Sequence, residues 1–289
     1  MIESINPSFA IFRDDLFPLM GGGNKARKMM ALHHTIQEGQ HTSIVTTGGI
    51  QSNHCRATAL YCSKYNLDCT LVLHGNKEKF LTENGNARLI RNTNASVVFC
   101  NSDEISLEMD KAMLNYKALG QKPFYLYGGG HTLEGSKAYI DIIEEIKSSG
   151  FVPDYIFLAS GTGSTQAGLL AGISKYQLKT KVIGISVGRE KKRSEKIIKE
   201  FYSELCNRYS IPENVNNITV ADEFLCGGYE KFNVEILQIS NNSYTKYGIP
   251  LDTTYTAKAF YGMQQIIKKQ MITGNILFWN TGGIFNYFN

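Results

Sequence analysis

Short apolar runs alternate with amphipathic segments along most of the chain. Runs rich in Val, Ile and Phe are typical of buried strands, whereas apolar positions spaced three and four apart are typical of helices that cover a sheet. This alternation predicts an α/β fold in which parallel-rich, twisted sheets are flanked by helices. The pattern predicts strands at 9–13, 43–47, 69–74, 95–100, 124–127, 155–159 and 182–187, and helices at 29–37, 55–65, 85–92, 107–119, 133–148 and 168–176.

Length and composition narrow the class of protein without naming a function. The chain has 289 residues, of which 43% are hydrophobic and 19% charged. These values are typical of a globular protein with one large or two medium domains, and they argue against disorder. The net charge of +4 is too small for a nucleic-acid-binding surface, which needs a concentrated basic stripe. A small anionic ligand is compatible with this charge.

The cysteines and the N-terminal residues indicate a cytoplasmic protein. Residues 1–10 have no basic segment followed by an apolar run, and no run of about 18 apolar residues predicts a membrane span. The six cysteines form no C-x-x-C pair, so we expect reduced thiols and no metal site. Cys55 and Cys62 are expected to share one face of a helix and to pack in the core.

A glycine-rich segment with three cations is the first candidate for chemistry. Residues 21–28 read Gly-Gly-Gly-Asn-Lys-Ala-Arg-Lys and follow a predicted strand. Cations at a helix start oppose the helix dipole, and a nearby anion would relieve this. Lys25 in a close, glycine-rich corner could be desolvated, as a Schiff-base lysine requires. A surface loop with solvated lysines is the alternative, and the spacing does not match a Walker A loop.

A second loop joins a predicted strand to a predicted helix at residues 48–54, Gly-Gly-Ile-Gln-Ser-Asn-His. Backbone N–H groups at such a junction can surround an anion. Ser52 and Asn53 suit the N-cap of the helix. Capping alone would explain both residues. The functional alternative adds a substrate carboxylate or an activated Ser52 hydroxyl.

The third loop, residues 160–168, reads Ser-Gly-Thr-Gly-Ser-Thr-Gln-Ala-Gly between a predicted strand and helix. Its hydroxyls and backbone N–H groups could bind a phosphate. Gln166 occupies the third glycine position of a dinucleotide fingerprint, and Gly188 stands where an acidic residue would bind ribose. A single phosphate is therefore favoured over a dinucleotide, and a glycine-rich packing turn is the structural alternative.

With these three loops in this order, the chain resembles a family of pyridoxal-phosphate enzymes, the 1-aminocyclopropane-1-carboxylate deaminases and D-cysteine desulfhydrases. The resemblance runs from about Phe9 to about Asn286. It implies the two-domain fold type II of the tryptophan synthase β-subunit, with pyridoxal 5'-phosphate as cofactor. Residues 1–39 plus 135–289 would form the large domain and 40–134 the small one, with the active site in the cleft. The family also implies a homodimer, whereas the small net charge and the lack of a long apolar run predict no nucleic-acid or membrane partner.

The resemblance assigns roles to individual residues. Lys25 would hold the cofactor through an imine and shuttle a proton, and the catalytic residues would be Lys25, Ser52, Tyr229 and Tyr255. The cofactor would be bound by Lys25, Lys28, Asn53, Thr162, Gly163, Ser164, Thr165, Tyr229 and Thr281, with Thr281 facing the pyridine nitrogen. The substrate would be bound by Ser52, Asn53, His54, Tyr255 and Thr256. No residue is assigned to a metal.

Two positions separate the subfamilies. The deaminases are expected to carry Glu and Leu where this chain has Thr256 and Thr281. The pattern therefore resembles the desulfhydrases and predicts a lyase that performs β-elimination on a small D-amino acid, releasing pyruvate, ammonia and sulfide. Asn280 and the segment 230–233 depart from the family pattern. A cyclopropane deaminase, a D-serine-type dehydratase and a non-catalytic cofactor-binding protein stay open as alternatives.

Overall fold

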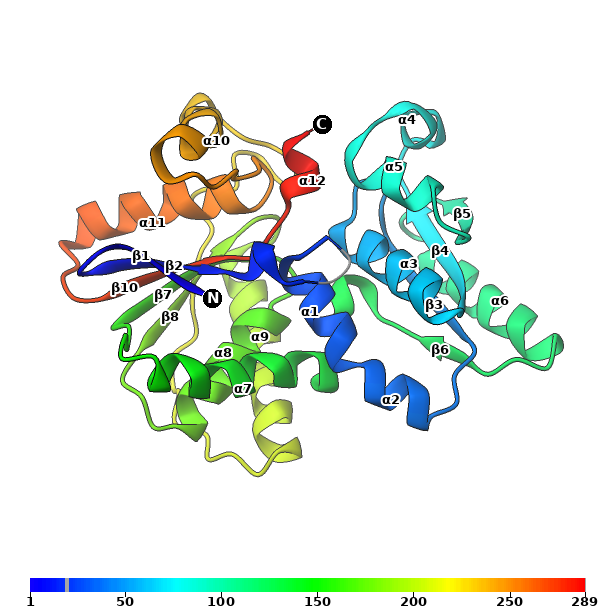
Figure 1. The fold of residues 1–289 in the computed structure, drawn as a ribbon, viewed down its shortest axis with the longest axis horizontal. Helices are drawn as coiled ribbons and strands as arrows, with labels where there is room; N and C mark the ends of the chain where they lie inside the picture. Colours follow the sequence, from blue (N-terminus) through cyan, green and yellow to red (C-terminus); the bar gives the residue numbers. More distant parts are fainter. Residues whose placement is uncertain (19–20, 289) are drawn as a thin grey trace. The chain divides into compact units, whose positions relative to one another are not determined.

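The structure is a computed structural model that describes residues 1–18 and 21–288, and the chain divides into two compact units (Figure 1). The larger unit combines Met1–Phe17 with Ser136–Tyr287, and the smaller is chiefly Pro18–Gly135. In the described residues, no helix is both long and apolar enough to cross a membrane.

A six-stranded sheet forms the centre of the larger unit, in the order β1-β2-β10-β7-β8-β9. All its pairings are parallel except β1 with β2. The C-terminal strand β10 therefore lies between β2 and β7, which are far apart in sequence. The strands are β1 (Ile2–Asn6), β2 (Phe9–Arg13), β7 (Tyr155–Ser160), β8 (Lys181–Ser186), β9 (Thr219–Ala221) and β10 (Ile276–Asn280).

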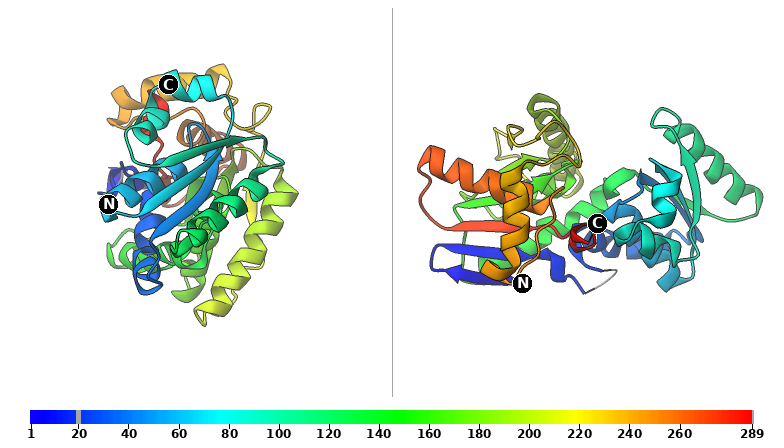
Figure 2. Two further views of the ribbon diagram at one scale, coloured as in Figure 1. Left: turned by 90° about the vertical axis from the view of Figure 1, so that its right-hand side faces the viewer. Right: turned by 90° about the horizontal axis from the view of Figure 1, so that it is seen from above.

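Helices cover both faces of this sheet (Figures 1 and 2). Phe157 and Ile185 point to the face where Phe260 of α11 completes an apolar core. The opposite face carries Trp279, whose ring packs near that of Tyr139 on α7. The helices are η1 (Asp14–Leu16), α7 (Leu133–Ser148), α8 (Ser164–Lys175), α9 (Lys191–Arg208), α10 (Val234–Tyr247), α11 (Thr256–Gln270) and α12 (Ile284–Tyr287).

The smaller unit contains a four-stranded parallel sheet in the order β5-β4-β3-β6. Alternate residues face opposite sides, so that Ile44 packs in the core with Cys55 and Cys62 of α3, whereas Val45 packs against Met109 of α6. The elements are α1 (Gly23–Ala31), α2 (His33–Glu38), β3 (Ser43–Gly49), α3 (Asn53–Tyr65), β4 (Asp68–His74), α4 (Lys77–Thr82), α5 (Gly85–Arg91), β5 (Ser96–Cys100), α6 (Ile105–Ala118), β6 (Pro123–Tyr125) and η2 (Gly128–Gly130).

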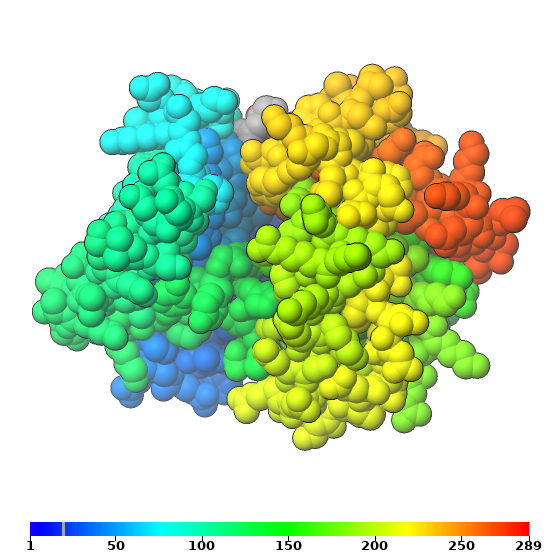
Figure 3. All heavy atoms as spheres, turned by 180° about the vertical axis from the view of Figure 1, so that it is seen from behind, coloured from blue at the N-terminus to red at the C-terminus, as the bar shows by residue number. Residues whose placement is uncertain are grey.

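The predicted α/β class with parallel-rich sheets is confirmed, and the prediction of a single helix over residues 29–37 was wrong. The first helix begins at Gly23 rather than at residue 29, and it is separated from α2 at Leu32. Three cations and a glycine run conceal this helix start in the sequence, because neither is typical of a first helical turn. The basic residues Lys191, Lys192 and Arg193 are exposed at the start of α9. The segment that contains α9 is drawn in yellow-green in Figure 3.

Residues 18–39, which the sequence analysis grouped with the large domain, pack in the smaller unit. The physical reason is the contact between α1 and α3. Arg56 of α3 donates hydrogen bonds to the carbonyl groups of Gly21 and Gly22, which directly precede α1. The exact extent of the functional domains stays a prediction.

Candidate active site

Lys25 lies in the first turn of α1 and is partly buried. Its Nζ donates a hydrogen bond of 3.0 Å to the carbonyl oxygen of Gly129 in η2. Lys28, one turn further, is only 1% exposed. Two lysines on the same face of one short helix therefore place amine groups within the smaller unit, instead of extending into solvent.

The backbone before Lys25 takes a conformation that requires glycine. Gly21, Gly22 and Gly23 have φ angles of 77°, 71° and 86°, a region that side chains with a Cβ rarely adopt. The carbonyl groups of the first two are held by Arg56 Nη1 and Nη2 at 2.9 and 3.1 Å. Arg56 is 2% exposed, and burial lowers its pKa to about 10. Arg56 was not predicted as part of the site, although a lone arginine in a predicted buried helix was a usable signal.

Ser52 is the N-cap of α3, as its position predicted. Its Oγ accepts a hydrogen bond of 3.2 Å from the backbone N–H of Cys55. Asn53 is 8% exposed, and its Oδ1 accepts a hydrogen bond from Asn86 Nδ2 at 3.0 Å. A Cβ at Gly48 would lie 2.6 Å from Ser52 Oγ, so the turn needs glycine there. Capping thus accounts for Ser52, and its catalytic role stays a prediction.

His54 follows in the first turn of α3 and is 2% exposed. Its Nε2 lies 2.8 Å from Thr46 Oγ1 of β3. Burial first, and then the positive charges of Lys25 and Lys28, hold the pKa of His54 well below its usual value. The imidazole is therefore neutral and cannot pair as a cation with a substrate carboxylate. This environment argues against the side-chain contact with substrate that the sequence analysis expected, and that contact stays a prediction.

The predicted phosphate loop of the larger unit joins β7 to α8. Gly163 is the N-cap of α8 with φ of 86°, and a Cβ there would lie 2.5 Å from Ile198 Cγ1. Thr162 Oγ1 and Ser164 Oγ are 3.4 Å apart, and Ser164 and Thr165 are buried. The loop has small hydroxyl side chains at a helix N-terminus, the arrangement that binds phosphate oxygens through backbone N–H groups.

The two predicted tyrosines meet in the larger unit. The hydroxyl groups of Tyr229 and Tyr255 share a short hydrogen bond, and their rings pack edge to face. Burial first, and then the neighbouring Tyr229, raise the pKa of Tyr255 well above its ordinary value. Tyr255 therefore stays protonated and can donate a proton or a hydrogen bond. Tyr229 is 43% exposed, so one end of the pair is open to solvent.

Asp252 organises the start of α11, which carries Tyr255. Its carboxylate accepts hydrogen bonds from the backbone N–H groups of Thr254, Tyr255 and Thr256. The Thr256 hydroxyl donates to Asp252 Oδ1 at 2.8 Å and accepts from the Asp252 N–H at 2.8 Å. Burial raises the pKa of Asp252 to about 6, although these hydrogen bonds oppose the shift. An aspartate four residues before a threonine at a helix start was a signal that the sequence analysis did not use.

Buried polar atoms gather where β7 and β10 end. Thr281 follows β10 and is 6% exposed, and a Cβ at Gly283 would lie 2.6 Å from Asp252 Oδ1. Ser160 Oγ and Asn280 Nδ2 are buried and have no hydrogen-bond partner among the described residues. Ligands of parallel α/β sheets bind at the carboxyl ends of strands. A polar ligand there would satisfy both atoms, which would otherwise be costly to bury.

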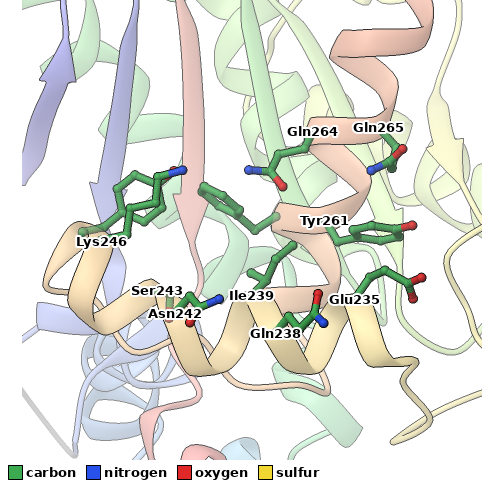
Figure 4. A pocket seen from close by; sticks show the side chains of 11 residues that line it. Glu235, Gln238, Ile239, Asn242, Ser243, Lys246, Tyr261, Gln264 and Gln265 are labelled. Carbon is green, nitrogen blue, oxygen red and sulfur yellow. The ribbon is translucent and has the colours of Figure 1, made fainter.

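A separate cavity of the larger unit lies between α10 and α11 and has a volume of ≈ 330 Å³ (Figure 4). Polar side chains such as Gln238, Asn242 and Gln264 line it, together with Lys246 and Glu235. Its lining includes none of the predicted site residues. The predicted chemistry and this cavity are therefore distinct features of the molecule.

These arrangements define a class of protein. Each unit has a sheet that is wholly or mostly parallel. The smaller unit holds two lysines in a helix that follows a glycine run, and the larger unit has a hydroxyl-rich loop at a helix start. A partly buried lysine is suited to form a Schiff base with an aldehyde cofactor, and the loop is suited to the phosphate of that cofactor. The fold and the residues together are those of a pyridoxal-phosphate enzyme.

Comparison with known proteins agrees with this class. The model of the family described as pyridoxal-phosphate dependent enzyme matches residues 6–282, and the chain belongs to this family. D-cysteine desulfhydrase of Yersinia enterocolitica is 33% identical, over 94% of this chain and 86% of the relative. A Thermotoga maritima protein provisionally named 1-aminocyclopropane-1-carboxylate deaminase is 34% identical, over 96% and 88%. The crystal structure of an ACC deaminase homologue superposes with a TM-score of 0.89 at 32% identity, over 97% and 86%.

The residues fit pyridoxal phosphate by their chemistry. The amine of Lys25 is the group that would hold the aldehyde. The loop at Gly163 offers the N–H groups and hydroxyls of a phosphate site, and the buried Asn280 Nδ2 lacks a partner among the described residues. Within the smaller unit, Lys25, Lys28 and His54 act on one another electrostatically. Within the larger unit, Tyr229 and Tyr255 are in contact.

Proposed function

We propose that the protein is a lyase that performs β-elimination on D-cysteine or a closely similar D-amino acid. Water and D-cysteine would give pyruvate, ammonia and hydrogen sulfide. When bound, pyridoxal phosphate supplies the electron sink that makes the α-proton of an amino acid removable. Lys25 would hold this cofactor. Support comes from the family, from the desulfhydrase relative and from the residues described below.

The roles of the chain's own residues follow from their environments. We propose that Lys25, partly buried beside Gly129, takes the α-proton of the substrate. The N-terminus of α3, with Ser52 and Asn53, would bind the substrate carboxylate through its N–H groups and hydroxyl. Tyr255 keeps its proton because its pKa is raised, so it would donate to the departing sulfur. Thr162, Ser164 and Thr165 would bind phosphate, and Thr281 would bond to the ring nitrogen.

One observation carries the choice of a sulfur substrate over a cyclopropane. Position 256 is a buried threonine whose hydroxyl is engaged on both sides with Asp252. It provides no carboxylate beside Tyr255. The cyclopropane amino acid has no proton on its α-carbon, so its ring must be opened by other acid–base groups. D-cysteine has an α-proton and a good leaving group, and needs no added carboxylate.

A substrate panel with purified, cofactor-loaded protein tests this proposal. We expect sulfide and pyruvate from D-cysteine, much less from L-cysteine, and no 2-oxobutyrate from 1-aminocyclopropane-1-carboxylate. Production of 2-oxobutyrate at the higher kcat/KM would replace the proposal with the deaminase function. Turnover of D-serine alone would indicate a dehydratase. A cofactor absorbance band near about 410 nm without any turnover would indicate a non-catalytic binding protein.

The assembly and compartment belong to the same proposal. We propose a cytoplasmic homodimer, as the family implies. All six cysteines are free thiols in the structure, which suits a reducing compartment. Sedimentation equilibrium would test the dimer, because a monomer at micromolar concentration contradicts it. Fractionation of cells that express the full chain would test the compartment.

A further inference from the structure

A short chain of hydrogen bonds ends at His54 in the smaller unit. Thr46 Oγ1 on β3 lies 2.7 Å from the carbonyl oxygen of Leu126 and 2.8 Å from His54 Nε2. Thr46 is fully buried, and His54 is 2% exposed. All three residues belong to the smaller unit, so this chain is independent of the other unit.

The donor and the acceptor in each of these hydrogen bonds can be assigned from the protons that each group carries. A carbonyl oxygen cannot donate, so the single hydroxyl proton of Thr46 points to Leu126. The hydroxyl oxygen must then accept from His54, and Nε2 must carry the imidazole proton. Because the imidazole is neutral, Nδ1 has no proton and presents a lone pair. Thr46 thus selects one tautomer of His54.

The lone pair of Nδ1 faces the part of the unit that holds the lysines. Nδ1 is buried and has no hydrogen-bond partner among the described residues. It lies 3.5 Å from the point where a Cβ of Gly130 would stand, and Lys28 Cδ lies 3.7 Å from the same point. The charged groups acting on the imidazole are Lys25 and Lys28 of α1. The other neighbours identified, Thr46 and the η2 glycines, carry no charge.

We propose that Thr46 is a positioning residue that holds His54 as the Nε2–H tautomer, so that Nδ1 presents a lone pair, and not a proton, to the part of the site that holds the lysines. This lone pair suits the positive charges of Lys25 and Lys28, which act on the imidazole. A lone pair repels a carboxylate, so the His54 side chain does not bind the substrate carboxylate. This inference rests on the proposed function only for its effect on catalysis, because the tautomer exists without substrate.

The tautomer can be measured directly on the full chain, with and without pyridoxal phosphate. Two-bond 1H–15N spectra of protein labelled at histidine distinguish a protonated from an unprotonated ring nitrogen. The His54→Asn variant identifies which signals belong to His54. We expect Nε2 protonated and Nδ1 unprotonated between about pH 5 and 8. Protonated Nδ1 of His54 in the wild-type protein overturns the proposal.

A matched pair of variants tests the role of Thr46. Thr46→Val removes the hydroxyl that accepts from His54. Thr47→Val removes the neighbouring hydroxyl, which donates to the carbonyl oxygen of Val72 at 2.8 Å and does not bond to His54. We expect Thr46→Val to contain a mixture of both His54 tautomers. We expect Thr47→Val to keep the Nε2–H tautomer alone. An unchanged tautomer in Thr46→Val contradicts the proposal.

The catalytic consequence separates this role from substrate binding. We expect kcat for the D-amino acid substrate to fall about tenfold in Thr46→Val, with KM nearly unchanged. A rise in KM at constant kcat would assign His54 to the substrate and overturn the inference. If no substrate is turned over by the wild-type protein, the proposed function fails, while the spectra still decide the tautomer.

Discussion

The helix starts of α1 and α8 look alike in sequence and differ in construction. Both follow glycine-containing segments, and the N-cap glycine of each helix has a positive φ. At α1, three glycines and the Arg56 clamp bring a lysine side chain into the protein. At α8, one glycine caps the helix and small buried hydroxyl side chains form its first turn. The backbone at this helix start is therefore suited to bind a phosphate. Glycine therefore permits two kinds of site, one that presents a side chain and one that presents the backbone.

The largest effect that this comparison predicts is on Lys25. Lys25→Ala is expected to abolish the cofactor band and to lower kcat/KM by at least about 10³-fold, since the amine has no substitute. Absorbance spectra and sulfide release measure both. Lys196→Ala is the control, because it also removes one positive charge but at an exposed position. Retention of the band in Lys25→Ala would show that another residue holds the cofactor.

The backbone site at α8 should be sensitive to a single methyl group. Gly163→Ala is expected to lower the free energy of unfolding by about 3 kcal/mol, because φ is 86° and the Cβ would collide with Ile198. Gly161→Ala is the matched control, since its Cβ would make an ordinary contact of 3.6 Å with Val187. Urea unfolding measures both. Equal losses in the two variants would remove the argument for a constrained turn.

The next largest effect is expected at Arg56, which binds the carbonyl groups of Gly21 and Gly22 before α1. Arg56→Met is expected to lower the free energy of unfolding by about 3 kcal/mol at most, because the hydrogen bonds of a buried guanidinium to the carbonyl groups of Gly21 and Gly22 are lost. Arg208→Met, at an exposed position of α9, is the control. A variant with wild-type stability and a wild-type cofactor band would mean that the glycine turn does not depend on Arg56.

A third helix start, at α11, differs from the other two because its contribution to stability is expected to depend on pH. The pKa of Asp252 is about 6 in the folded protein and near 3.8 when exposed. The folded state therefore binds this proton more tightly, and the stability due to Asp252 is fully present below pH 3.8 and is lost as pH rises through 6. Relative to Asp252→Asn, we expect the wild-type protein to lose about 2 kcal/mol between about pH 4 and 6. A pH-independent difference between the two proteins contradicts this pKa.

The helix and strand periods of the sequence located most elements between residues 9 and 187, whereas no element was predicted beyond residue 187. Strand β2 and helix α7 have the predicted bounds, because their apolar spacing matches one period throughout. The edge strand β1 was missed, since its half-exposed residues show no buried run. The start of α1 was missed because Lys25, Arg27 and Lys28 oppose the helix dipole, a conflict that local propensity counts against a helix. Such conflicts are expected at functional sites.

The site residues also divide into those that could be placed from sequence and those that could not. Ser52 and Gly163 could be placed from sequence, because capping and turn chemistry involve residues only a few positions apart. The partners of His54 could not be placed. Thr46 lies on β3 and Leu126 follows β6, 80 residues later, and a hydrogen bond between such distant segments has no periodic signal. The hydrogen bonds of Asp252 to residues 254–256 had a local signal that was not used, whereas its closeness to the distant Gly283 had none.

The sequence by itself determined the family, the α/β class, the order of the loops and the candidate lysine, because these depend on residues that are close along the chain. Only the tertiary structure placed β10 between β2 and β7, held Gly21 and Gly22 with Arg56, and selected one tautomer of His54. These features depend on which distant segments become neighbours. The free energy of such contacts comes from burial and hydrogen bonding in three dimensions, which no short window of sequence contains.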